Sequence, residues 1–189
     1  MNNQLQGKKI AILATDGFEQ SELLKPKQAL EDAGAEVSVV SLKAGVIKGW
    51  NENNWGEKVT VDLTVEQANA EDFDALHLPG GVMNPDKLRV DEKAVAFVKS
   101  FFDAGKPVAA ICHAAWTLIN AEVVKGREMT SYPPLQKDLE NAGAKWVDKE
   151  VVVDNGLITS RNPDDIPAFN KKMIEEFAEG KHDKQMSAK

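Results

Sequence analysis

The segment that most constrains the fold of this chain is a short apolar run that ends in a cysteine and passes directly into a helix-compatible stretch. Residues Pro107 to Ile111 are apolar, Cys112 and His113 follow, and residues 114–124 suit a helix. A buried strand that leads straight into a helix is the repeating unit of a parallel α/β sheet. The sharp turn between the two is where α/β hydrolytic folds carry a nucleophile, at a nucleophile elbow.

Cys112 is the only cysteine of the chain, and His113 is one of three histidines. Side chains alternate along a strand, but a tight strand-to-helix turn allows two adjacent side chains to approach one pocket. The N-terminus of the following helix would favour the thiolate. The alternative is that Cys112 is a small buried apolar residue. Ala110 and Ala114 stand where such elbows usually have glycine, and alanine is the least intrusive replacement.

Length and composition indicate one domain, at residues 1–180, followed by a polar tail at residues 181–189 that we expect to be frayed. The formal net charge of -7 argues against a dedicated nucleic-acid-binding protein, which would carry a basic face. We find neither a signal peptide nor an apolar run near the ~18 residues that span a bilayer. A single cysteine excludes an internal disulfide, so we expect a cytoplasmic protein. Because no apolar run is long enough to span a bilayer, we also expect no membrane partner.

Strands alternate with helices along the chain, which predicts an α/β fold with a mostly parallel sheet and helices on both faces. Pro26 lies within the first helical pattern, so that helix is either kinked or begins later than its pattern suggests. Asn155-Gly156 is a strong hairpin signal. We expect strands at residues 9–15, 37–42, 73–78, 107–111 and 129–132, helices at 19–33, 91–104, 114–124, 133–142 and 164–179, and hairpins within 43–62 and 150–160.

The order and spacing of several motifs resemble the ThiJ/PfpI superfamily, which is related to the class I glutamine amidotransferases, and within it the PfpI-like intracellular proteins. The resemblance covers about residues 8 to 178 and implies a flavodoxin-like sandwich. The motifs are Asp16-Gly-Phe-Glu19, Phe73-Asp-Ala-Leu-His-Leu-Pro-Gly-Gly81, Gly105-Lys-Pro-Val-Ala-Ala-Ile-Cys-His113, Gly126-Arg127, Thr130-Ser-Tyr-Pro133, Asn141-Ala-Gly-Ala144, Glu150-Val-Val-Val-Asp154 and Ser160-Arg-Asn-Pro-Asp164.

The resemblance implies the catalytic residues. Cys112 matches the family nucleophile and His113 the histidine that follows it. Glu19 matches the carboxyl group against the sulfur, where we expect a raised pKa. Asp86 matches the acid that orients this histidine from a neighbouring subunit. Read without the resemblance, Glu19 is a helix N-terminal acid and Asp86 an ordinary surface acid.

The resemblance also implies how the substrate is held. The backbone amides of Gly81 and His113 would form an oxyanion hole, and Gly80 and Trp116 would adjoin the substrate. The alternative for the two glycines is a tight turn at the end of a strand. Trp50, in the predicted hairpin, could line a pocket or a subunit contact, as could Trp55, whereas Trp146 is expected in the core.

The chain departs from the family pattern at two places. Cys-His is followed by Ala114-Ala115 instead of Gly-Pro, which alters the pocket wall near Trp116. His77 stands where an aliphatic residue is usual, and we expect a core histidine with its hydrogen bonds satisfied. No His-x-x-His or Cys-x-x-Cys spacing supports a metal site, and the chemistry needs no cofactor.

Three functions fit the sequence. The first is a stress-defence enzyme that uses Cys112 on reactive carbonyls, as a glyoxalase or as a deglycase that acts on glycated proteins or peptides, and releases lactate from methylglyoxal or its adducts. The second is an intracellular cysteine peptidase with a Cys112–His113–Asp86 triad completed across subunits. The third is a redox sensor without enzymatic activity. The resemblance implies a homo-oligomer, either a dimer or a hexamer.

Overall fold

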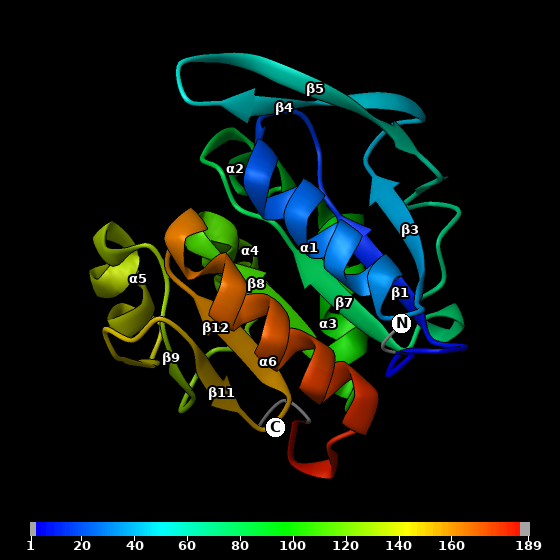
Figure 1. The fold of residues 1–189 in the computed structure, drawn as a ribbon. Helices are drawn as coiled ribbons and strands as arrows, with labels where there is room; N and C mark the ends of the chain where they lie inside the picture. Colours follow the sequence, from blue (N-terminus) through cyan, green and yellow to red (C-terminus); the bar gives the residue numbers. More distant parts are fainter. Residues whose placement is uncertain (1–2, 186–189) are drawn as a thin grey trace.

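A seven-stranded sheet forms the centre of the molecule in a computed structural model that describes residues 3–185 (Figure 1). Its strand order is β11-β12-β8-β7-β1-β3-β6, and all pairs are parallel except β11 with β12. The predicted, mostly parallel α/β sheet is therefore confirmed. The strands are β1 (Lys9–Leu13), β3 (Glu36–Ser41), β6 (Leu63–Thr64), β7 (Ala75–Leu78), β8 (Val108–Ile111), β11 (Val152–Asp154) and β12 (Leu157–Ser160).

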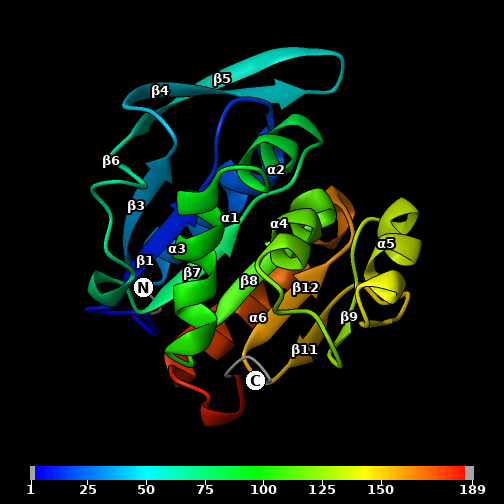
Figure 2. The ribbon, with the colours of Figure 1, turned by 180° about the vertical axis from the view of Figure 1, so that it is seen from behind.

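Helices cover both faces of this sheet. Figure 1 shows α1 (Gln20–Asp32) and α6 (Ile166–Glu179) on one face, and Figure 2 shows α3 (Glu92–Asp103) and α4 (Ala115–Asn120) on the other. Each face has its own apolar cluster: Phe169 and Met173 of α6 belong to one, and Phe101 and Leu118 to the other. Two short helices, α2 (Met83–Leu88) and α5 (Gln136–Asn141), complete the set.

The predicted hairpin within residues 43–62 forms a wall above one end of the main sheet. Strands β4 (Gly45–Asn51) and β5 (Asn54–Val61) pair antiparallel, and the short β2 (Phe18–Glu19) pairs with β4. Side chains tie this three-stranded sheet to the rest of the fold: Lys48 N donates to Asp16 Oδ1 at 2.8 Å, and Glu57 N donates to Gln20 Oε1 at 2.7 Å. A small parallel pair, β9 (Glu128–Met129) with β10 (Lys145–Trp146), lies beside β11.

The structure decides two local expectations, for the Asn155-Gly156 turn and for the helix that contains Pro26. Asn155 and Gly156 both have positive φ, 47° and 83°, and join β11 to β12 as a tight hairpin. Helix α1 runs through Pro26, so it does not begin after the proline.

The expected frayed tail at residues 181–189 is wrong for residues 181–185. Gln185 is fully buried, donates through Nε2 to Lys106 O at 2.8 Å, and accepts from Arg127 Nη2 at 2.6 Å. Composition misled the prediction because these polar groups meet backbone and guanidinium partners inside the fold. Residues 186–189 lie outside the described part of the chain.

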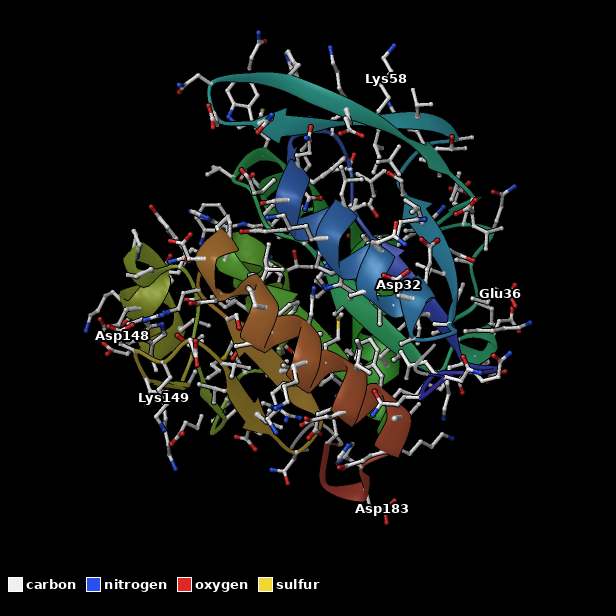
Figure 3. The ribbon with its side chains drawn as sticks, in the orientation of Figure 1. Asp32, Glu36, Lys58, Asp148, Lys149 and Asp183 are labelled. Atoms are coloured by element: carbon white, nitrogen blue, oxygen red, sulfur yellow. The ribbon has the colours of Figure 1, made fainter. Side chains whose placement is uncertain are left out.

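The acidic excess of the chain is carried at the surface. Figure 3 shows the acidic side chains of Asp32, Glu36, Asp148 and Asp183 at the periphery of the molecule, and all four are exposed. Within residues 3–185 no helix is long and apolar enough to cross a membrane.

Candidate active site

Cys112 occupies a strained elbow between β8 and α4. Its φ is 63°, in the left-handed region that non-glycine residues rarely adopt. The strand ends at Ile111, and residues Cys112–Ala114 form a single tight turn before α4 begins. The turn brings the two neighbouring side chains together as expected, with Cys112 Sγ 3.1 Å from His113 Nδ1.

The loop after β7 approaches the sulfur with two glycines. A Cβ on Gly80 would lie 2.5 Å from Glu22 Oε2 and 2.7 Å from Cys112 Cβ, so only glycine fits there. Gly81 has a φ of 80°, and the backbone N–H groups of Gly81 and His113 act to lower the pKa of the Cys112 thiol. The glycines therefore do more than turn the chain: they bring N–H donors to the reactive atom.

A buried asparagine on α2 fixes this loop. Asn84 Nδ2 donates to Pro79 O at 2.9 Å and to Gly80 O at 3.0 Å, while Thr15 N donates to Asn84 Oδ1 at 2.8 Å. One amide thus joins the ends of β1 and β7. Sequence reasoning missed Asn84, because α2 was not predicted.

The carboxyl group against the sulfur belongs to Glu22, which corrects the assignment to Glu19. Glu22 is fully buried in the first turn of α1, its Oε2 accepts from Gly80 N at 2.8 Å, and its carboxyl group lies beside Cys112, where it raises the pKa of the thiol. Glu19 lies before the helix, in β2, and accepts from Ser21 Oγ at 3.3 Å. The physical reason is helical period: the inward face of α1 carries residue 22, three positions after the residue that precedes the helix.

Burial sets the protonation of the three reactive groups. It raises the pKa of Glu22 to about 8, against the opposing effect of the Gly80 N–H and with a further rise from nearby Glu19. Burial, and then the Glu22 carboxylate, raises the pKa of the Cys112 thiol, although the amides of Gly81 and His113 oppose this. Burial lowers the pKa of His113. The expected thiolate is therefore not the resting form; a neutral imidazole stands ready to accept the thiol proton.

Two aromatic rings pack against the His113 imidazole and hold it in place. The Tyr132 ring stacks on it at 4.8 Å with an interplanar angle of 27°, and the Trp116 ring meets it edge-on at 5.0 Å. Trp116 is itself fixed, because its Nε1 donates to Asp138 Oδ2 at 3.1 Å. Asp86 lies on the exposed side of α2, so its assignment to the histidine of a neighbouring subunit remains a prediction.

These groups open into a pocket of about 560 Å³ between the elbow and the β4–β5 hairpin. The hairpin contributes Trp50, whose ring meets Trp55 edge-on at 5.5 Å, and Tyr132 lines the opposite side. Three acidic residues line the pocket, and no lysine or arginine does so among the described residues. The acids are Glu19, Glu22 and Glu52.

The two other residues expected in the core, Trp146 and His77, combine apolar packing with hydrogen bonds. Trp146 is half-buried and its Nε1 donates to Ser131 Oγ at 3.0 Å. His77 is fully buried, as expected, and both ring nitrogens face backbone carbonyls.

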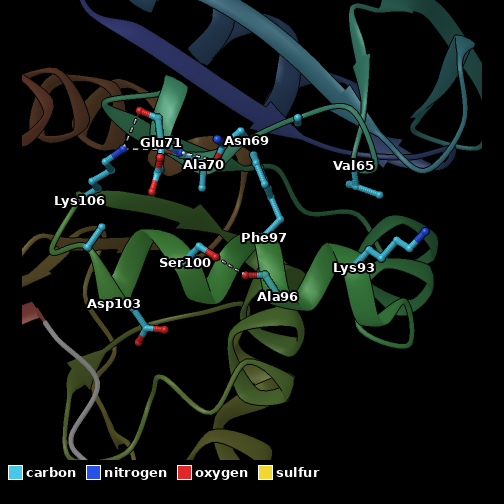
Figure 4. A pocket seen from close by; sticks show the side chains of 12 residues that line it. Val65, Asn69, Ala70, Glu71, Lys93, Ala96, Phe97, Ser100, Asp103 and Lys106 are labelled. Carbon is cyan, nitrogen blue, oxygen red and sulfur yellow. Dashed lines mark hydrogen bonds between the residues drawn. The ribbon is translucent and has the colours of Figure 1, made fainter.

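Two further features lie away from the sulfur. A cavity of about 620 Å³ separates the loop before β7 from α3 (Figure 4), where Lys106 Nζ donates to Ala70 O at 2.7 Å and to Phe73 O at 2.6 Å. Glu176, Glu179 and His182, at the end of α6, are the one group in residues 3–185 whose ligand atoms could hold a metal ion. His182 N donates to Gly105 O, before the start of β8, which is the end of the strand opposite to Cys112.

Comparison with known proteins agrees with this geometry. A profile of the DJ-1/PfpI family matches residues 8–176. The chain is 48% identical over 170 residues to General stress protein 18 of Bacillus subtilis, covering 89% of this chain and 96% of that protein. It is 46% identical over 170 residues to Protein/nucleic acid deglycase 2 of Escherichia coli, covering 88% and 96%.

The fold agrees as well. The crystal structure of Drosophila melanogaster DJ-1beta superposes with a TM-score of 0.82 at 31% identity, over 90% of each chain. The motifs around Cys112, the parallel sheet and these matches lead to one assignment: this chain belongs to the DJ-1/PfpI family, within the ThiJ/PfpI superfamily.

Proposed function

We propose that the protein is a cysteine-dependent deglycase that releases lactate from methylglyoxal adducts on amines and thiols. The observation that carries this proposal is the buried Glu22 carboxyl group in contact with the Cys112 sulfur. A carboxyl group whose pKa lies near the working pH exchanges protons in both directions, which an isomerisation through an enediol needs. The deglycase name of the E. coli relative and the stress-protein name of the B. subtilis relative support the same reading.

The reaction begins with a carbon–sulfur bond. His113 Nδ1, 3.1 Å from Sγ, accepts the thiol proton while sulfur bonds to the carbinol carbon of the adduct and the amine leaves with one proton. The product is a hemithioacetal of methylglyoxal on Cys112. Backbone N–H groups of Gly81 and His113 bind the ketone oxygen of this adduct and stabilise the negative charge that it gains when the carbon bonded to sulfur loses its proton.

Glu22 then moves a proton between adjacent carbons. Its carboxylate takes the proton from the carbon bonded to sulfur, which gives an enediol, and returns a proton to the neighbouring carbon. The result is a lactoyl thioester on Cys112. Water cleaves the thioester into lactate and the free thiol, so carbon skeleton, electrons and protons balance without a cofactor.

The acidic pocket restricts the substrate class. Glu19 and Glu52 create a negative local potential, and among the described residues no lysine or arginine lines the pocket to offset it. We therefore infer that neutral adducts and adducts on cationic side chains enter more readily than anionic ones. Adducts on arginine or lysine peptides fit this rule.

The test compares three variants on methylglyoxal and on a methylglyoxal-modified arginine peptide. Cys112→Ser should abolish lactate release, and Glu22→Gln should lower kcat by ~10²-fold or more, since general acid–base catalysis contributes on this scale. Glu19→Gln is the matched control: it removes an acid from the same pocket without touching the sulfur, and should retain activity within roughly threefold. Full lactate release by the Cys112→Ser protein, or equal losses in the two glutamate variants, would refute the proposal.

A second candidate is a cysteine peptidase, favoured by the Cys112–His113 pair at 3.1 Å. In that reading Asp86 of another copy completes the triad, as the sequence implied. The two candidates differ in Glu22, because acyl transfer to a peptide needs no proton transfer between carbons. A peptidase would keep casein cleavage in the Glu22→Gln variant.

A further inference from the structure

His77 is a polar residue in the middle of a buried strand, and nothing in the chemistry proposed above uses it. Its side chain is fully buried and faces α1 and α6, where its ring packs 5.6 Å from that of Phe169. Its neighbours Leu76 and Leu78 point to the opposite face of the sheet. Burying an imidazole costs free energy unless its nitrogens find partners.

The ring nitrogens of His77 reach two backbone carbonyls on different elements. Nε2 lies 2.8 Å from Glu22 O on α1, and Nδ1 lies 3.3 Å from Ala109 O on β8. Burial lowers the pKa of His77 to about 4, so the neutral ring has one N–H to donate. The shorter distance assigns that donor to Nε2 and its acceptor to Glu22.

Pro26 explains why the Glu22 carbonyl needs such a donor. In an α-helix the carbonyl of residue 22 accepts from the N–H of residue 26, but Pro26 has no N–H, and its ring pushes that carbonyl away from the helix axis. The whole of Glu22 is buried, so its carbonyl oxygen cannot accept from bulk water instead. The imidazole therefore supplies from the sheet the donor that the proline removes from the helix.

We propose that His77 is a positioning residue for the active site: by donating to the Glu22 carbonyl that Pro26 leaves without its helical partner, it holds the Glu22 carboxyl group against Cys112. The same ring touches the backbone of Ala109, three residues before the nucleophile. The bond to Glu22 thus fixes the first turn of α1 relative to β7, the strand that pairs with β8 and its sulfur. This inference rests on the role proposed for Glu22.

The test uses substitutions that differ in where they place an N–H group. The amide nitrogen of Gln reaches the place of Nε2, whereas that of Asn reaches only the place of Nδ1. His77→Gln should therefore keep the bond to Glu22 O, and His77→Asn and His77→Leu should lose it. Pro26→Ala restores a backbone N–H to the same carbonyl, so the double variant Pro26→Ala/His77→Leu should recover what His77→Leu loses.

Two measurements are made on each variant. The first is the rate of Cys112 alkylation by iodoacetamide against pH, which reports directly because Cys112 is the only thiol. The second is kcat/KM for lactate release. We expect His77→Leu and His77→Asn to shift the midpoint of the alkylation profile by about half a pH unit or more, and to lower kcat/KM ~10-fold, the effect of one positioned hydrogen bond. His77→Gln and the double variant should stay close to wild type.

A merely structural role gives a different pattern. It would lower the melting temperature of every variant without moving the alkylation midpoint, and Pro26→Ala would not restore the His77→Leu protein. That pattern, or equal behaviour of the Gln and Asn variants, overturns the proposal. If His77→Leu does not fold, the Gln and Asn pair decides. Failure of the wild type to release lactate would refute the proposed function alone, since the alkylation profile needs no substrate.

Discussion

At the scale of single residues, the site depends on groups held in states that water would not favour. Cys112 is held at a φ of 63° and is only 8% exposed, and Glu22 is fully buried with a pKa raised to about 8. Each state needs a specific neighbour: Gly80 leaves room for both side chains, and its N–H binds the carboxylate. The reactivity of the thiol is therefore a property of the pair, because the charge of the Glu22 carboxylate raises the pKa of the neighbouring Cys112 thiol.

The pH dependence of turnover follows from Glu22. Its folded pKa of about 8 lies above the ordinary 4.5, so Glu22 stays protonated at neutral pH and its carboxylate form increases as pH rises through 8. If the carboxylate takes the proton from carbon, kcat/KM should rise by about 16-fold in total between pH 6.5 and 8, as the ionised fraction of Glu22 increases. A pH–rate profile on the modified peptide measures this. An ascending limb centred near pH 4.5 would contradict it.

At the scale of elements, the site lies at the carboxyl ends of the parallel strands. The chain after α6 packs against the opposite, amino-terminal ends of the strands. Gln185 connects β8 with the segment before β9, through Lys106 O and Arg127. This closure and the reactive sulfur lie at opposite ends of β8. Stability and chemistry can therefore be altered separately.

Removal of residues 181–189 should lower the free energy of unfolding by ~2–3 kcal/mol, because it removes the hydrogen bonds from His182 N to Gly105 O, from Gln185 Nε2 to Lys106 O and from Arg127 Nη2 to Gln185 O. A chain that ends at Gln185 is the matched control, because it keeps these bonds. Urea denaturation measures the difference. The rate of Cys112 alkylation below the transition should be equal in the two proteins, and a fall in the shorter one would show that the two ends are coupled.

Sequence patterns predicted this architecture better than they predicted the site. Apolar runs and helical periods identified the main strands and most helices, since burial decides those elements. Helix α2 escaped because it is six residues long and contains Pro85. Glu22 was missed because the Asp16-Gly-Phe-Glu19 motif drew the assignment, and only the position of the first helical turn decides which acid faces the sulfur.

Tyr132 shows a second reason why the site was harder to predict than the fold. It follows β9 in sequence, yet its ring stacks on His113, and its N donates to Cys112 O at 3.2 Å. Such contacts arise between segments far apart in the chain. No local pattern contains them.

At the scale of the whole molecule, one chain contains the thiol, its base and the carboxyl group, but leaves Asp86 exposed. If Asp86 serves a neighbouring copy, the protein acts as an oligomer, and loss of either residue should be repaired by mixing. Cys112→Ser and Asp86→Asn chains, each inactive or impaired alone, would then form mixed dimers with one intact site.

After unfolding and refolding together, an equal mixture of these two variants should recover ~25% of wild-type activity, since half of random dimers are mixed and each carries one intact site of two. Lactate release before and after co-refolding measures this. Refolding each variant separately before mixing is the control. Recovery no greater than in that control would place the whole active site within a single chain.

The wall formed by β4 and β5 belongs to a separate sheet from the strands that carry the reacting groups. It reaches the pocket through Trp50 and Glu52, and the side-chain N–H of Trp50 donates to Glu52 O within the hairpin itself. Substrate selection and catalysis are thus encoded by different segments of the chain. Relatives can therefore differ in the substrates that they admit while the chemistry stays the same.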